Sequence, residues 1–208
     1  EVCASAPGLF PAYGLHPLFL ARHQPRHLEE LRGWIERERP LALGECGLDY
    51  WAEGLDRGDQ DSYFRAQLEL ATEAGLPVIV HARRAVEETL LVLRDHDGLR
   101  GVVHSFSGSR QQAERLWERG FLLGIGGPVT YARAKRLRRL VADMPLEYLL
   151  LETDSPDQPD CRTRGQRNEP ANLVTVLETV AALREEDSAA IAAATTANAE
   201  RLFNLPPS

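Results

Sequence analysis

The chain has 208 residues, 43% of them hydrophobic and 26% charged, which is ordinary for a globular protein with one sizeable domain. Its net charge of −7 argues against a protein that coats nucleic acid by bulk electrostatics, and no apolar run approaches the ~20 residues of a membrane span. Three cysteines without a C-x-x-C pair argue against a disulfide framework or a zinc ribbon and favour a cytoplasmic protein.

Short apolar runs alternate with stretches of helical periodicity along the whole chain. Runs rich in Val, Ile and Leu, apolar on both faces as buried strands must be, predict six strands: 10–15, 41–45, 77–81, 101–104, 121–125 and 148–153. Helices are predicted between and after them, at 25–39, 59–75, 84–97, 109–120, 131–143, 168–183 and 187–203. Gly75 followed by Pro77 ends the second helix, and Ser109 with Gln112 in capping-box spacing begins the fourth.

Strict alternation of strand and helix predicts right-handed β-α-β crossovers and a parallel sheet. The sheet is either open and doubly wound or closed into a barrel. A glycine-rich phosphate loop would favour the open form, but no G-x-G-x-x-G follows the first predicted strand.

Five of the six predicted strands end at, or just before, a residue that can do chemistry. These residues are His16, Glu45, His81, His104 and Asp154. The carboxyl ends of barrel strands meet at one face, whereas an open sheet gathers them only near a topological switch point. Five converging ends therefore predict an α/β fold, a TIM-type (β/α)8 barrel with about six of its eight βα units present in this chain.

Four of these residues predict a metal centre. A single histidine at a strand end is more often a structural residue, but two histidines with two carboxylates at four strand ends are not explained in that way. Glu45 and Asp154 would repel each other if they were buried together, and a divalent cation removes that cost. We therefore predict Glu45, His81, His104 and Asp154 as metal ligands, a set that suits Zn, Mn, Fe or Ni better than Mg. Glu152 could orient one of them.

Three further residues are candidates for substrate binding. His16 precedes a proline, so it either faces the substrate or simply ends an extended segment. Arg83 and Arg84 directly follow the third predicted strand and should lie at the rim of the site, where guanidinium groups recognise phosphate. The alternative for these arginines is an ion pair with Glu87 or Glu88 at the start of the next helix.

Six segments, taken together and in this order, resemble the TatD family of metal-dependent hydrolases and deoxyribonucleases. They cover nearly the whole chain: Gly-Leu-His-Pro (14–17), Gly-Glu-Cys-Gly-Leu-Asp-Tyr (44–50), Val-Ile-Val-His-Ala-Arg-Arg (78–84), His-Ser-Phe-Ser-Gly-Ser (104–109), Glu-Thr-Asp-Ser-Pro (152–156) and Arg-Asn-Glu-Pro (167–170).

The resemblance implies an amidohydrolase-type TIM barrel with two divalent metal ions per subunit, of Zn, Mg or Mn. By motif, Glu45 would bridge both ions, His81 and His104 would hold one, and Asp154 would hold the other. Asp154 would also be the catalytic residue that orients or deprotonates the attacking water. DNA would be the substrate, and we expect neither membrane association nor a stable protein partner.

The sequence departs from the family pattern in one respect. The family opens with a strand carrying Asp-x-His-x-His, and this chain has no such motif. The count of six strands, where a barrel of this class has about eight, indicates the same gap. We expect a single domain over residues 1–208 that is incomplete at its N-terminus. Two other interpretations stay open: a hydrolase of a small amide, ester or lactone on the same centre, or a degenerate, inactive fragment.

Overall fold

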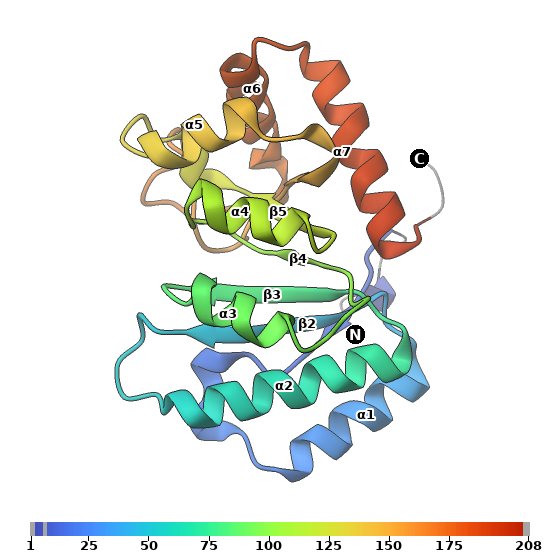
Figure 1. Ribbon diagram of the computed structural model, residues 1–208. Helices are drawn as coiled ribbons and strands as arrows, with labels where there is room; N and C mark the ends of the chain where they lie inside the picture. Colours follow the sequence, from blue (N-terminus) through green and yellow to red (C-terminus); the bar gives the residue numbers. More distant parts are fainter. Residues whose placement is uncertain (1–2, 6–7, 206–208) are drawn as a thin grey trace. The chain divides into compact units, whose positions relative to one another are not determined.

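The computed structural model describes residues 3–5 and 8–205. The chain divides into two compact units, Glu1–Gly101 (unit 1) and Val102–Ser208 (unit 2), and strand β4 (Gly101–Val103) spans the boundary. Each unit alternates strands with helices, as the periodicity predicts (Figure 1). Among the described residues, no helix combines the length and the apolar character that crossing a bilayer requires.

In the described part of unit 1, parallel strands follow one another in chain order, β1 beside β2 and β2 beside β3. Tyr13 pairs with Leu43 of β2, and Leu43 pairs with Val78 of β3. Figure 1 shows α2 running along β2 and β3, with α1 next to α2. The elements are η1 (Cys3–Ser5), β1 (Ala12–Tyr13), η2 (Pro17–Arg22), α1 (Arg26–Glu38), β2 (Ala42–Asp49), α2 (Arg57–Ala74), β3 (Val78–Arg83) and α3 (Val86–Leu93).

Helix α2 packs one apolar face into the core of unit 1. Phe64, Leu68 and Ala71 fall at i, i+4 and i+7, and all three are 0% exposed. Burying each of the two larger side chains stabilises the fold by about 1.5–3 kcal/mol. Asp56 caps the start of the helix with its side chain, and Gly75 ends it in the left-handed conformation, as predicted.

The first two strands differ in length from their predictions. β1 has only two residues because Pro11 has no N–H to donate and because the backbone N–H of Leu15 donates to the Gln67 side chain (2.6 Å). β2 does not end at Glu45. It continues to Asp49, because pairing with β3 resumes after a register shift between Gly44 and Cys46.

Unit 2 contains the parallel pair β5 and β6, in which Leu123 pairs with Leu149 and Ile125 with Leu151. The predicted capping box of Ser109 and Gln112 is present at the start of α4. The elements are α4 (Arg110–Trp117), β5 (Phe121–Ile125), η3 (Gly127–Thr130), α5 (Lys135–Asp143), η4 (Leu146–Tyr148), β6 (Leu149–Leu151), η5 (Pro170–Asn172), α6 (Leu173–Arg184) and α7 (Ser188–Phe203).

Candidate metal centre

Glu45 lies inside β2 at the register shift. Gly44 pairs with Ile79 and Cys46 pairs with Val80, so Glu45 is the residue inserted between two ladder positions. Such a bulge redirects the side chain of the extra residue. Cys46 is 0% exposed whereas the Glu45 side chain is 26% exposed, so the bulge brings a carboxylate to an accessible position on a buried strand.

Glu45, His81 and His16 form a compact group in unit 1. Oε1 of Glu45 lies 2.7 Å from Nδ1 of His81 and 3.4 Å from Nε2 of His16. The two imidazole rings meet edge-on, with their centroids 4.6 Å apart. One ligand atom from each residue lies within 4.8 Å of the others, so the group has the size of a metal site.

Asp49 fixes the tautomer of His81. Asp49 is 0% exposed, and its Oδ2 lies 2.8 Å from Nε2 of His81. Burial alone would raise the pKa of this carboxyl group. Hydrogen bonds to its charged form, chiefly from the backbone N–H of Ala52 and from His81, outweigh burial and hold the pKa below its ordinary value. The ionised carboxylate therefore accepts the hydrogen on Nε2 of His81.

With its hydrogen on Nε2, His81 presents the lone pair of Nδ1 to Glu45. Two lone-pair atoms at 2.7 Å repel each other unless a proton or a metal cation binds between them. A histidine ligand whose second nitrogen donates to a buried carboxylate is a common arrangement in metal sites. The Glu45–His81 pair, supported by Asp49, therefore fits a divalent cation.

His16 takes the same tautomer as His81 but turns its other nitrogen toward Glu45. Its Nδ1 accepts a hydrogen bond from the backbone N–H of Leu18 (3.1 Å), so a neutral His16 carries its hydrogen on Nε2. That N–H faces the Glu45 carboxylate. His16 is close enough to be counted with the ligands, but this tautomer makes it a hydrogen-bond donor to an oxygen rather than a lone-pair ligand.

Arg83 and Arg84 lie at the carboxyl end of β3, where both are exposed. Their guanidinium carbons lie 5.2 and 3.9 Å from the ring centroid of Trp51, which follows the end of β2. Sequence reasoning placed these arginines at the rim of the site. It missed Trp51, although this residue directly follows the Gly-Glu-Cys-Gly-Leu-Asp-Tyr segment.

A second histidine–carboxylate group lies in unit 2. Oε1 of Glu152 lies 3.0 Å from Nδ1 of His104 and accepts the backbone N–H of Ser105 (2.7 Å). Nδ1 of His104 therefore donates, and Nε2 directs its lone pair toward Oδ1 of Asp154 at 3.8 Å. A Cβ atom at position 124 would overlap the Glu152 carboxyl group, so a larger residue there would displace this carboxyl group from its present position. The predicted contact between Glu152 and a candidate ligand is present.

Gln158 holds Asp154 from the other side. Its Nε2 donates to Oδ2 of Asp154 (2.7 Å), and its Oε1 accepts a hydrogen bond from Oγ of Ser105 (2.8 Å). No sequence pattern marks Gln158, because a glutamine in a long loop has no characteristic spacing. Asp49, by contrast, belongs to the Gly-Glu-Cys-Gly-Leu-Asp-Tyr segment (44–50) and lies four residues after Glu45, a position that could have drawn attention to it.

The predicted site residues thus form two groups, one in each unit. Glu45, His81 and His16 come together in unit 1, where Arg83 and Arg84 lie at the end of the strand that carries His81. His104 and Asp154 face each other in unit 2. In both groups a carboxylate binds the second nitrogen of the candidate histidine ligand.

Comparison with known proteins reveals clear relatives. The family described as TatD related DNase matches residues 1–204. The "Uncharacterized metal-dependent hydrolase YjjV" of Escherichia coli K12 is 42% identical over 201 residues, which are 95% of this chain and 78% of the relative. The "3'-5' ssDNA/RNA exonuclease TatD" of Salmonella typhimurium is 36% identical over 206 residues, 96% of this chain and 79% of the relative.

Solved structures agree with the sequence relatives. The crystal structure of Escherichia coli YjjV has a TM-score of 0.93 and 40% identity, and covers 99% of this chain and 81% of its own. A TatD family hydrolase from Entamoeba histolytica, at 21% identity and covering 94% of this chain and 74% of its own, has a TM-score of 0.81 and bears on the fold alone. The predicted TIM-type α/β fold is confirmed.

Proposed function

Because this chain belongs to the TatD family, whose members include metal-dependent hydrolases, we propose that it hydrolyses phosphodiester bonds of DNA. The observation that carries the proposal is the Glu45–His81 pair, with Asp49 fixing the tautomer that leaves Nδ1 to a cation. Two exposed arginines, Arg83 and Arg84, lie at the end of the strand that carries His81 and suit an anionic substrate. The Salmonella typhimurium relative is named a 3'-5' ssDNA/RNA exonuclease, and this name supports a nucleic-acid substrate.

We assign two divalent metal ions, of Zn, Mn or Mg, to the centre. Glu45 and His81 of unit 1, and His104 and Asp154 of unit 2, are the residues that would hold them. Imidazole nitrogen in the ligand set favours Zn or Mn over Mg. When bound, such ions supply Lewis-acid polarisation of a phosphoryl group and an activated water at neutral pH.

The protein's own groups would position the substrate and move the proton. Asp154, held by Gln158 at Oδ2, keeps Oδ1 to accept a proton from the attacking water. His16 would donate its Nε2 hydrogen to a phosphoryl oxygen, and this bond strengthens as negative charge develops there. Arg83 and Arg84 would bind the phosphates of the substrate strand.

We also propose a cytoplasmic location. Within the described part of the chain, Cys3, Cys46 and Cys161 are all unpaired, as expected of a protein from a reducing compartment.

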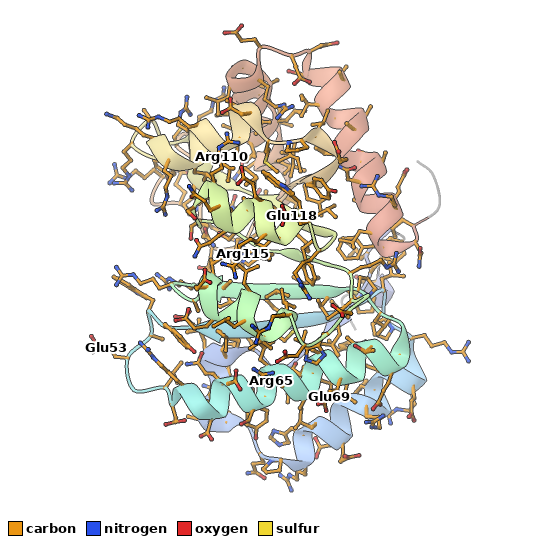
Figure 2. All side chains as sticks on the ribbon, in the orientation of Figure 1. Glu53, Arg65, Glu69, Arg110, Arg115 and Glu118 are labelled. Carbon is orange, nitrogen blue, oxygen red and sulfur yellow. The ribbon has the colours of Figure 1, made fainter. Side chains whose placement is uncertain are left out.

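The test combines metal binding with a substrate panel. The wild-type protein should hydrolyse single-stranded DNA with added Mn²⁺ or Zn²⁺ and lose this activity in EDTA. Glu45→Ala should lose both metal binding, measured by isothermal titration calorimetry, and hydrolysis. Glu69→Ala, which removes an exposed carboxylate on α2 (Figure 2), should change neither.

Two results would overturn the assignment. Full metal-dependent nuclease activity in Glu45→Ala would remove Glu45 from the centre. Turnover of a small ester or lactone without any cleavage of DNA would show that the protein is a hydrolase of small molecules and not a nuclease.

A further inference from the structure

Trp51 is an exposed aromatic residue on the loop that joins β2 to α2, and Figure 2 labels Glu53 on the same loop. The residue is 49% exposed, so much of its indole ring is open to solvent. The guanidinium carbon of Arg84 lies over the ring at 3.9 Å, which is van der Waals contact, and that of Arg83 lies at 5.2 Å.

The loop that carries Trp51 is held in place by hydrogen bonds. Oδ1 of Asp49 accepts the backbone N–H groups of Trp51 and Ala52, both at 2.9 Å. The backbone N–H of Tyr50 donates to the carbonyl oxygen of Arg83 (2.9 Å), which extends the pairing of β2 with β3 into the loop. The indole is therefore fixed beside the end of β3.

Asp49 connects this aromatic group to the candidate centre. One oxygen of its buried carboxylate binds the Trp51 loop, and the other lies 2.8 Å from His81. The position of the indole and the orientation of the candidate ligand thus depend on the same side chain.

The backbone of Arg84 supports a functional interpretation. Its φ of +53° lies in the left-handed region, which a residue other than glycine occupies only when its surroundings enforce it. Such conformations gather at binding sites. Here the strained turn follows β3 directly and carries the guanidinium that covers Trp51.

A second tryptophan shows what an ordinary surface pair looks like. Trp34 is 48% exposed and has the guanidinium carbon of Arg37 4.9 Å from its ring centroid. Both residues belong to α1 and are three positions apart, so helix geometry alone brings them together. Trp51 and Arg84, in contrast, come from the ends of two different strands.

We propose that Trp51 and Arg84 form a stacking site for one nucleobase of a single-stranded nucleic acid. Bases stack on aromatic rings and on guanidinium planes whatever their sequence, and a base within a duplex is not available for this contact. The inference rests on the proposed function, because the stacked nucleotide would hold its phosphate at the centre beside His81. Trp51 is a substrate-binding residue in this proposal, and Asp49 positions it.

Fluorescence tests the stacking without any metal or turnover. The Trp34→Phe/Trp117→Phe variant leaves Trp51 as the single tryptophan of the sequence. It is titrated in EDTA with a thymidine hexanucleotide and with an abasic hexanucleotide of equal charge. We expect the thymidine strand to quench the fluorescence and the abasic strand not to do so. Equal quenching by both, or none, would overturn the stacking site.

Kinetics then test whether the site serves hydrolysis. Trp51→Ala should raise KM for the thymidine hexanucleotide roughly 5- to 100-fold, because stacking is a binding interaction that the ground state already makes. Trp51→Phe should recover most of this loss, and Trp34→Ala should match the wild type. On the abasic strand, Trp51→Ala and the wild type should have the same KM.

The two experiments separate the stacking site from the proposed function. Base-dependent quenching in the single-tryptophan variant, combined with no oligonucleotide cleavage by the wild type, would support the stacking site and contradict the proposed nuclease activity. Metal-dependent cleavage with an unchanged KM in Trp51→Ala would support the proposed nuclease activity and contradict the stacking site.

Discussion

The clearest prediction concerns Asp49→Asn, a nearly isosteric change. The amide oxygen can still accept the backbone N–H groups of Trp51 and Ala52, so the loop should keep its shape. The amide nitrogen now faces Nε2 of His81, and it can only donate. His81 must then move its hydrogen to Nδ1, the nitrogen that faces Glu45. The variant should therefore fold and yet present the wrong tautomer to a cation.

The magnitude follows from the hydrogen bonds that are lost. Asp49→Asn keeps all three hydrogen-bond partners but replaces three charge-assisted bonds with neutral ones, so it should lower the free energy of unfolding by roughly 1–2 kcal/mol. Asp49→Ala removes the acceptor of three N–H groups and should cost roughly 3–5 kcal/mol. Loss of the partner that orients a histidine ligand lowers metal affinity about 10- to 100-fold, so Asp49→Asn should show this loss with little unfolding.

Urea denaturation of Asp49→Asn and Asp49→Ala measures the loss of stability, and Mn²⁺ titration of the same variants measures the loss of metal affinity. Asp95→Asn is the matched control, because Asp95 is a surface carboxylate that accepts a hydrogen bond from Arg65 (2.9 Å). It should leave metal affinity unchanged. Wild-type metal affinity in Asp49→Asn would refute the tautomer argument, as would a loss of stability equal to that of Asp49→Ala.

Two further predictions test side-chain packing near the candidate ligands, one in each unit. Gly124→Ala places a Cβ atom against the Glu152 carboxyl group, so it should lower the free energy of unfolding by roughly 1–3 kcal/mol and reduce DNA cleavage. Urea denaturation and a cleavage assay measure these two effects. Wild-type stability together with wild-type cleavage would contradict the prediction. Burial raises the pKa of the Cys46 thiol, whereas Cys161 is exposed, so in a Cys3→Ser background Ellman's reagent should label Cys161 at once and Cys46 only on unfolding. Fast labelling of both thiols in the folded protein would show that Cys46 is accessible.

The sequence predicts the secondary structure of this protein well where periodicity is strong. Phe64, Leu68 and Ala71 mark the buried face of α2, and the capping box begins α4 where predicted. β2 was predicted too short because a charged residue inside an apolar run looks like the end of a strand. The bulge at Glu45 shows why this is wrong: the charged side chain is redirected while the strand continues.

Candidate ligands were predictable because strand order alone brings the ends of neighbouring parallel strands together. Their hydrogen-bond partners were not. Asp49 meets His81 across 32 positions of the sequence, and Gln158 meets Ser105 across 53. Such contacts depend on the register of the strands and on the path of a loop, and neither leaves a periodic signal. The tautomers of His16 and His81 follow from these contacts, so they become visible only with the structure.

These hydrogen bonds divide the unit 1 site into an inner and an outer part. In the inner part, His81 and Asp49 are buried or nearly so, and each binds the other. In the outer part, Trp51 and Arg84 are exposed; Trp51 lies on the loop after β2, and Arg84 directly follows the end of β3. A change in the outer part should therefore alter KM for the nucleic acid at unchanged metal affinity, and a change in the inner part should alter metal affinity first. If Trp51→Ala weakened Mn²⁺ binding as strongly as Asp49→Asn does, the loop would be part of the metal site, and the division would be wrong.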